Sequence, residues 1–514
     1  MNKKIHFFIS AVLAVLISPS LFSQEGEAGI KWGGFVKVDL FNDSRAVVAA
    51  RDDMYMLYPA ERKQVTQAPG GTSTSPCGIL STNPEACLVY IYGNTEDLNA
   101  VKQTSITAVQ SRLSGTITGP TAFGAKTGGF LEVDFFGTAN NETWMTRLRH
   151  AYVTMDWGSS KILAGMTWYP LFVAGYHPDT VQFSPISPIH PFGRAPQIKF
   201  SQDLGGGLNL HIAGVYRAYH ADFGPAANSV TTTDGSVYNS RFKRWADKPD
   251  IDIQLEYKSD MFSGGITVEA NELRPYDNVV SYDGTTTASQ IGNNKNKVNG
   301  MTWQLFAKVL FDKDNNGQIR FNYVKSQNNA NLIMLGGYAE KSNFILNNLT
   351  ALGISASEAT LIKAFTRKEY TPINVTSYWI QPIWGKDIEY SIVLGKSINN
   401  GAKDDVGTFY SRGSNIKSVT SVIPQIKFKS GKTMIGIMLG HFEAEYMEDD
   451  KTFKAIYLLI KQQAGLAGLT TTYDKIVLGG FTLPDPAVRD SKGKIGDTYK
   501  VVDRRLQISV QQNF

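Results

Sequence analysis

The chain has 514 residues, of which 51 are Lys or Arg and 46 are Asp or Glu, so its formal net charge is +5. The basic residues are spread along the chain without a cluster, which gives no basis for nucleic-acid binding. Past the N-terminus no apolar stretch reaches the roughly 18 residues of a membrane-spanning helix, although 11% of the residues are aromatic. Two fold classes remain, a soluble secreted protein and a β-barrel.

The N-terminus has the pattern of a secretory signal peptide. Two lysines precede an apolar run over 7–17, and small residues including Ser23 follow it. The run is well short of the roughly 20 residues that cross a bilayer as a helix, so it is not a membrane anchor. We predict cleavage after Ser23, which removes 1–23 and leaves 24–514 as a single domain.

The chain has only two cysteines, Cys77 and Cys87. A secreted protein folds in an oxidising compartment, where cysteines pair. We therefore predict a disulfide between them that staples one loop, with a redox role as the alternative.

Alternation of apolar and polar residues decides between the two fold classes. Over 250–258, Ile251, Ile253, Leu255 and Tyr257 share one side of a strand, and polar residues occupy the other side. A membrane barrel strand needs this pattern over about ten positions, because one face meets lipid and the other meets the lumen. Since the pattern recurs along the chain, it favours a barrel.

Sixteen such segments follow one another, joined by alternately short and long connections. The predicted fold is all-β, a closed antiparallel transmembrane β-barrel of about sixteen strands with short periplasmic turns and long extracellular loops. A barrel of this size leaves an aqueous lumen. Two long loops contain predicted helical stretches near 342–365 and 451–463. The predicted strands are 30–42, 105–118, 127–137, 143–157, 161–168, 195–203, 208–217, 250–258, 263–271, 301–311, 318–326, 374–384, 387–397, 417–429, 433–446 and 500–514.

Four neighbouring segments carry a family resemblance. They read QSRL at 110–113, EVDFFG at 132–137, RLRHAY at 147–152 and AGMTW at 164–168. In these segments the chain resembles the DcaP-like trimeric porins, and the resemblance extends over about 105–170. It implies a sixteen-stranded homotrimeric channel of the bacterial outer membrane, with a basic constriction that favours small anionic solutes such as dicarboxylates. The two helical insertions have no counterpart in that family.

Strand alternation also places basic side chains inside the barrel. If Val109, Leu113 and Ile117 face lipid, Arg112 faces the lumen, and the same reasoning applies to the other strands. Rings of fixed positive charge raise the local anion concentration and set selectivity. The predicted pore-lining cations on strands are Arg112, Arg147, Arg149, Lys199, Arg217, Arg320 and Arg505.

Acidic side chains placed inside by the same reasoning leave an alternative open. These acids can form ion pairs with the basic residues, which would brace the inner wall without a net charge preference. The acidic residues concerned are Asp39, Glu132, Asp134, Asp252 and Glu256.

A long, proline-rich segment over 169–194 follows the fifth strand, at the position where porins of this type fold a loop into the channel. We predict that it narrows the lumen through His177, Asp179 and Arg194, with its prolines stiffening the path. An ordinary surface loop is the alternative. His177 and His190 have weak spacing for a metal site, so we expect neither a metal nor another cofactor.

The sequence shows no nucleophile elbow, no phosphate-binding Gly-rich loop and no His-Glu-x-x-His motif, so we expect no enzyme. A hydrolase with Ser, His and an acid grouped on the outer face remains an alternative. We predict an outer-membrane porin for passive diffusion of small hydrophilic, anionic solutes, surrounded by lipid. The alternative is a barrel that acts as an adhesin or assembly partner through its loops. An energy-coupled transporter is disfavoured, because the strands begin almost directly after the signal peptide and leave no room for a plug domain.

Overall fold

The computed structural model describes most of the chain. The predicted signal peptide and the predicted helix at 451–463 lie outside the described residues, as does most of the stretch at 342–365. Within the described part, no helix combines the length and apolar character that a membrane crossing requires. The described residues are 28–51, 53–63, 71, 75, 77–83, 86–87, 90, 96–217, 222–225, 236–275, 278–282, 288–293, 295–314, 316–343, 349–350, 352–358, 368–448 and 489–514.

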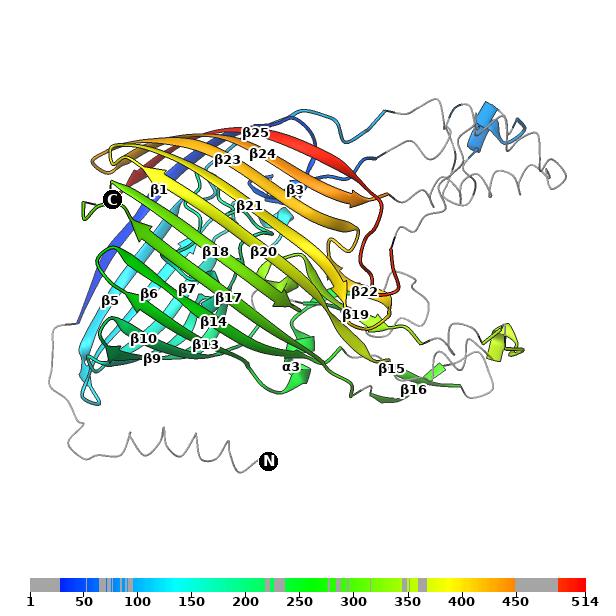
Figure 1. The fold of residues 1–514 in the computed structure, drawn as a ribbon, viewed down its shortest axis with the longest axis horizontal. Coiled ribbons are helices and arrows are strands. Elements are labelled where there is room, and N and C mark those ends of the chain that lie inside the picture. Colours follow the sequence, from blue (N-terminus) through cyan, green and yellow to red (C-terminus); the bar gives the residue numbers. More distant parts are fainter. Residues whose placement is uncertain are drawn as a thin grey trace.

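Sixteen antiparallel strands close into one barrel, which confirms the predicted fold (Figure 1). The first strand, β1 (Gly29–Asp43), pairs with the last, β25 (Thr498–Asn513), and this pairing closes the ring. The other edge of β1 pairs with β4 (Gln103–Thr107) and β5 (Arg112–Ala122), which count as one interrupted strand. The other barrel strands are β6 (Ala125–Asp134), β7 (Arg147–Asp156), β8 (Ser160–Trp168), β9 (Arg194–Gly205), β10 (Leu208–Val215), β13 (Asp250–Lys258), β14 (Phe262–Leu273), β17 (Val298–Leu310), β18 (Gly317–Gln327), β20 (Tyr370–Trp384), β21 (Ile388–Ala402), β23 (Ile416–Ser430) and β24 (Thr433–Met447).

Short and long connections lie at opposite ends of the barrel. Tight turns such as 123–124, 206–207 and 431–432 form what we call the short-turn end, which is the periplasmic side in barrels of this type. The long connections lie at the other end, on the right in Figure 1. Residues 169–193 belong to these long connections.

Apolar side chains cover the outer face of the barrel, as the alternation predicts. On β13 the outward residues Ile251, Ile253 and Leu255 are 42%, 48% and 43% exposed, whereas Asp250 and Asp252 between them are buried. Every barrel strand is hydrogen-bonded on both edges, so no open sheet edge meets the membrane. This combination of closure and apolar cover is that of a membrane barrel of the bacterial outer membrane.

The second predicted strand is interrupted, and this makes one of its predicted orientations wrong. Residues 108–111 form a turn, in which Ser111 N donates to Ala108 O at 3.1 Å, between β4 and β5. Ile106 and Leu113 both point outward although they are seven positions apart, because the turn shifts the alternation by one residue. Val109 therefore does not face lipid and is fully buried.

Most strand boundaries also differ from the prediction by one or more residues, and two of these differences concern predicted pore-lining residues. The fourth strand begins at Arg147 rather than at 143, since 140–142 form a short 3-10 helix. The seventh ends at Val215, so Arg217 follows the strand instead of lying on it.

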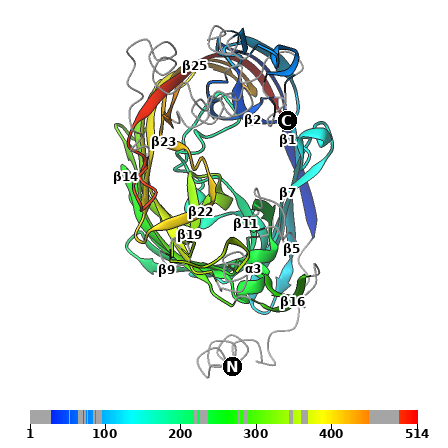
Figure 2. The same ribbon diagram turned by 90° about the vertical axis from the view of Figure 1, so that its right-hand side faces the viewer.

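The long connections contain hairpins that the sequence pattern did not predict. Figure 2 looks into the long-loop end and shows β2, β11, β19 and β22 inside the outline of the ring. These elements partly fill that end of the barrel. The additional elements are β2 (Val47–Ala50), β3 (Tyr55–Pro59), β11 (Asp222–Pro225), β12 (Ser236–Asn239), β15 (Asn278–Tyr282), β16 (Ala288–Asn293), β19 (Gly336–Lys341), β22 (Val406–Arg412), the helix α3 (Arg241–Ala246) and the 3-10 turns η2 (Gly78–Leu80), η3 (Asn140–Glu142), η4 (Pro170–Phe172) and η5 (Ala330–Leu332).

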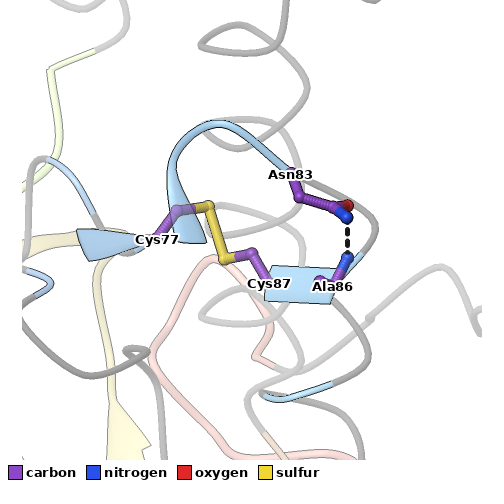
Figure 3. Close-up of a disulfide and its surroundings, with 4 residues drawn as sticks. All are labelled: Cys77, Asn83, Ala86 and Cys87. Atoms are coloured by element: carbon purple, nitrogen blue, oxygen red, sulfur yellow. Dashed lines mark hydrogen bonds between the residues drawn. A yellow bond between two sulfur atoms is a disulfide. The ribbon is translucent and has the colours of Figure 1, made fainter. Parts of the chain in front are cut away.

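The predicted disulfide between Cys77 and Cys87 is present in the loop after β3 (Figure 3). Both cysteines are buried, and Ala86 N beside them donates to Asn83 Oδ1 at 3.0 Å. The bridge joins two points of one loop.

Candidate pore constriction

The segment 169–193 between β8 and β9 lies inside the barrel, held by polar side chains of the inner wall. Gln304 Nε2 on β17 donates to Leu171 O at 2.7 Å, and Lys37 Nζ on β1 donates to Val181 O at 2.6 Å. Between them, Asp179 N donates to Gln381 Oε1 on β20 at 2.8 Å. Because β1 lies seven strands away from β17 around the sixteen-stranded ring, on the far side of the barrel, the segment, which we call the lumen loop, runs across the channel.

Stacked rings stiffen the lumen loop. The ring of Phe172 stacks on Trp168 at 3.9 Å and on His177 at 4.9 Å between ring centroids. His190 Nδ1 accepts a hydrogen bond from Trp379 Nε1 at 3.1 Å, which ties the far part of the loop to β20. A tightly packed loop keeps the width of the opening fixed.

Burial keeps both loop histidines neutral at pH 7. It lowers the pKa of His177 to about 4, assisted by the charge of Arg320, and it lowers the pKa of His190 to about 3. Both rings pack against Phe172, and no group of three His, Cys, Asp or Glu in the described residues is arranged to bind a metal ion. The histidines thus act as packing groups within the loop.

Asp179 docks the middle of the lumen loop onto the opposite wall. Its carboxylate lies 2.5 Å from Lys427 Nζ on β23. Burial alone would raise the pKa of Asp179, but the charges of Lys427 and Arg320 outweigh it and lower that pKa to about 2. The ion pair therefore persists over the whole physiological pH range.

Three of the predicted pore-lining arginines come together on neighbouring strands. Asp134 on β6 and Arg147 on β7 are register partners, and Arg147 Nε donates to the Asp134 carboxylate at 2.7 Å. Arg149 donates to Asp134 at 2.7 Å and to Glu132 at 2.5 Å. Both arginines are thus held in ion pairs, as the alternative interpretation proposed for this wall.

Arg112 differs from these two arginines. Its side chain is 20% exposed, and its Nη1 lies 3.8 Å from Glu132 Oε1, too far for a direct hydrogen bond. Arg194, at the end of the lumen loop, lies with its guanidinium 4.9 Å from the centroid of the Trp168 ring. Within this cluster, Arg112 therefore interacts with the Glu132 carboxylate only at long range, and part of its side chain remains in contact with solvent.

Arg217 and Arg505 lie apart from the constriction in separate buried networks. Arg217 donates to Asp250 at 2.5 Å and to Asp222 at 2.9 Å, and its side chain is fully buried. Arg505 makes two hydrogen bonds to Asp43, at 2.6 and 2.7 Å, and is equally buried. Enclosed in this way, both guanidinium groups have their charges balanced locally.

Arg320 meets the lumen loop from β18, where its Nη1 donates to His177 O at 3.0 Å. Lys199 lies on the inner wall of β9, between the outward-facing Ile198 and Phe200, and is partly buried. Arg320 thus contacts the lumen loop, whereas Arg112, Arg147 and Arg149 lie together on one wall. Lys199 belongs to neither group.

Three lysines of the inner wall were missed by the sequence reasoning: Lys37, Lys308 and Lys427. Lys37 is buried and pairs with Asp39 at 3.1 Å, and Lys427 holds Asp179. Each lies on the polar side of a predicted strand, so the alternation that selected the arginines also contained these positions. The missing information was which polar residues the lumen loop contacts.

The comparisons with family models and with curated protein sequences give no match. Among solved structures, the outer membrane channel DcaP of Acinetobacter baumannii is similar, with a TM-score of 0.53 and 14% identity over 96% of this chain and 99% of that one. OmpT of Vibrio cholerae in its trimer form has a TM-score of 0.46 and 7% identity over 95% and 100%. OmpF of Salmonella typhi has a TM-score of 0.44 and 10% identity over 94% and 97%. The resemblance stated from four short segments is therefore confirmed at the level of the fold, and the chain has the closed sixteen-stranded barrel of an outer-membrane porin.

Proposed function

We propose that the chain is a passive diffusion channel of the bacterial outer membrane, without enzymatic activity, that passes small hydrophilic solutes and prefers anions. Solutes would cross through the lumen beside the lumen loop, and lipid would surround the apolar outer face. The fold supports the channel, and the charges at the constriction support the preference.

The observation that carries the anion preference is an excess of cations on one wall of the constriction. An excess of one sign in a narrow, water-filled passage attracts counter-ions and repels co-ions. The carboxylates in this cluster are Asp39, Glu132 and Asp134, and the cations are Lys37, Arg112, Arg147, Arg149 and Arg194.

Within this cluster we assign the field felt by solutes mainly to Arg112. Arg147 and Arg149 have carboxylate oxygens within 2.7 Å, so their fields are largely cancelled at short range. Arg112 has its nearest carboxylate oxygen at 3.8 Å and is the more exposed of the three. Its removal should therefore change selectivity without leaving a buried carboxylate unpaired.

The test is single-channel recording in a planar bilayer under a salt gradient. The wild-type channel is expected to give stepwise conductance with an anion-selective reversal potential. Arg112→Gln is expected to reduce that selectivity, while Lys432→Gln, in the exposed turn between β23 and β24, serves as the matched control and leaves it unchanged.

Two results would contradict the proposal. A cation-selective or unselective wild-type channel would remove the anion preference and leave the diffusion channel. If correctly folded protein showed no conductance at all, the proposal of a channel would be refuted and the adhesin or assembly-partner alternative would be favoured.

We also propose a homotrimer, as the resemblance to the DcaP-like porins implies. Light scattering of the detergent-solubilised protein, corrected for bound detergent, is expected to give three chains per particle. A single chain per particle in mild detergent and in lipid nanodiscs would contradict this assignment.

A further inference from the structure

A second group of cations surrounds a pocket of about 330 Å³ on the inner wall, at the short-turn end. Tyr176 of the lumen loop covers one side of this pocket, and strands β13, β14 and β17 form its wall. The lining residues used below are Glu256, Lys258, Asp260, Ser263, Lys308 and Leu310, and Arg320 lies beside the pocket as the register partner of Lys308.

The strand register places these cations in one row. Lys258 on β13 is the partner of Ser263 on β14, Ser263 is the partner of Lys308 on β17, and Lys308 is the partner of Arg320 on β18. Directly opposed residues on one face of an antiparallel pair have Cβ atoms about 4.5–5.5 Å apart, and like charges in such positions are destabilising. Lys308 and Arg320 therefore repel each other unless an anion lies between them.

Nearby carboxylates do not provide that anion. Glu256 accepts hydrogen bonds from the Tyr176 hydroxyl and pairs with Lys258, each at 2.8 Å, so its charge is already matched. Asp260 lines the pocket from the exposed turn between β13 and β14, where its side chain is 85% exposed and its carboxylate lies 3.9 Å from Lys313.

Lys308 and Arg320 thus form no direct ion pair with any described residue, although the charge of Arg320 also acts on Asp179 of the lumen loop from a distance. Within the described part of the chain, no carboxylate oxygen lies within 4.0 Å of either. Arg320 donates to His177 O and to Gln318 Oε1, both neutral acceptors at 3.0 Å. Lys308 Nζ lies 5.6 Å from the centroid of the Tyr176 ring, which orients the ammonium group toward the pocket without neutralising it.

We propose that this pocket binds a small phosphate monoester. A phosphate group carries a charge of about −1.5 to −2 at pH 7 and three strong acceptor oxygens, which match Lys308 at the pocket, Arg320 beside it and the Ser263 hydroxyl. A single carboxylate has half that charge and would leave one cation unbalanced. The apolar side chain of Leu310, on the same inner face as Lys308, provides a surface for a compact organic group on the ester oxygen.

The site lies on the periplasmic side of the lumen loop, so it would hold a solute that has already passed the constriction. This inference rests on the proposed function only in that both use the same lumen. Binding to the pocket needs no ion flow, so it is measured separately from conductance.

The test is isothermal titration calorimetry of the detergent-solubilised barrel at low salt, with phenyl phosphate as the probe. We expect saturable binding at one site per chain, weaker binding of inorganic phosphate, which lacks the apolar group, and still weaker binding of benzoate, which has one charge. Lys308→Gln is expected to lower the affinity for phenyl phosphate roughly tenfold or more, because it removes one charge-assisted partner. Lys432→Gln is expected to leave the affinity unchanged.

Equal affinity of the wild type and Lys308→Gln would overturn the proposal, and so would equal binding of benzoate and phenyl phosphate. Circular dichroism of both variants checks that the barrel is intact. Should Lys308→Gln disturb folding, Lys258→Gln, whose side chain is half exposed, is expected to weaken phenyl phosphate binding by a smaller factor. Saturable binding to a protein that conducts no ions would support the phosphate site and refute the channel. Conductance without phosphate binding would support the channel and refute the site.

Discussion

Two regions of the inner wall bring basic residues close together, but they differ in how the charges are paired. On β6 and β7, Arg147 and Arg149 are buried and share the carboxylate of Asp134. On β17 and β18, Lys308 and Arg320 lie directly opposite each other without a carboxylate within 4.0 Å in the described chain. The first region uses its arginines to hold the wall together, and the second leaves its charge available to the lumen.

The comparison shows that the number of basic residues facing a channel does not give its charge. A guanidinium in contact with two carboxylate oxygens contributes little to the field a few ångströms away, whereas an unpaired ammonium contributes fully. Selectivity should therefore follow the least paired residues, Arg112, Lys308 and Arg320, and stability should follow the most paired ones.

The largest effect is expected when Asp134, the acid that Arg147 and Arg149 share, is removed. Asp134→Asn leaves Arg147 and Arg149 buried with one fewer negative charge, and breaking a buried ion pair in this way costs about 3–5 kcal/mol of unfolding free energy. Urea unfolding from lipid vesicles, followed by tryptophan fluorescence, measures the loss. A loss below about 1 kcal/mol would show that these arginines find other partners and that the region is not braced by Asp134.

The next largest effect is expected when an acid is introduced into the region of Lys308 and Arg320. Lys308→Glu places a carboxylate opposite Arg320 and changes the local charge by two units. A cross-strand ion pair contributes only roughly 0.2–1 kcal/mol, so the unfolding free energy should change little. The reversal potential in a salt gradient should shift toward lower anion preference. An unchanged reversal potential would mean that this wall lies outside the path of the ions.

The sequence predicted the barrel well because strand alternation is a local signal. Each residue of a strand such as β13 shows its face by its own polarity, and the turn residues mark the ends. The prediction was wrong at Val109, where a turn within one strand shifts the alternation, and at Arg217, which lies past the end of its strand. Neither break changes the local composition enough to be seen.

The pairing of charges could not be predicted from the sequence for a different reason. Alternation places Arg147 and Asp134 inside the barrel, but their contact depends on the register between β6 and β7. The contacts of the lumen loop depend on a path that no periodicity describes, which is why Lys427 and its partner Asp179 were not connected. The arginines were therefore identified as a group, while the division into paired and unpaired charges needed the fold.

Acidification is expected to act on the lumen loop, which lies between the two regions. The pKa of His177 is lowered from 6.5 to about 4 in the docked loop, so between these pH values an undocked loop binds a proton that the docked loop does not. Docking is therefore favoured fully above pH 6.5 and weakens as the pH falls toward 4. Asp179, whose pKa is lowered from 3.8 to about 2, keeps its contribution until the pH falls below 3.8.

Hydrogen–deuterium exchange of residues 172–190, expressed as protection factors, measures this loss. Protection should fall between pH 6.5 and 4 in the wild type. His177→Gln should reduce the slope and leave the part that comes from His190, whose pKa is lowered to about 3. The same pH dependence in His177→Gln would show that another group controls docking.

The smallest effect is expected from an ion pair on the same hairpin as the buried cluster, at its exposed end. Asp156 and Lys161 lie 3.8 Å apart across the turn between β7 and β8, with side chains 40% and 47% exposed. An exposed pair of this kind is screened by water and contributes roughly 0–1 kcal/mol, so Asp156→Asn should leave the urea midpoint nearly unchanged. Both this change and Asp134→Asn remove one carboxylate facing a basic residue, and they differ in burial. If they destabilised the barrel equally, the loss of pairing alone would explain the effect; a difference of several-fold assigns it to the burial of Arg147 and Arg149.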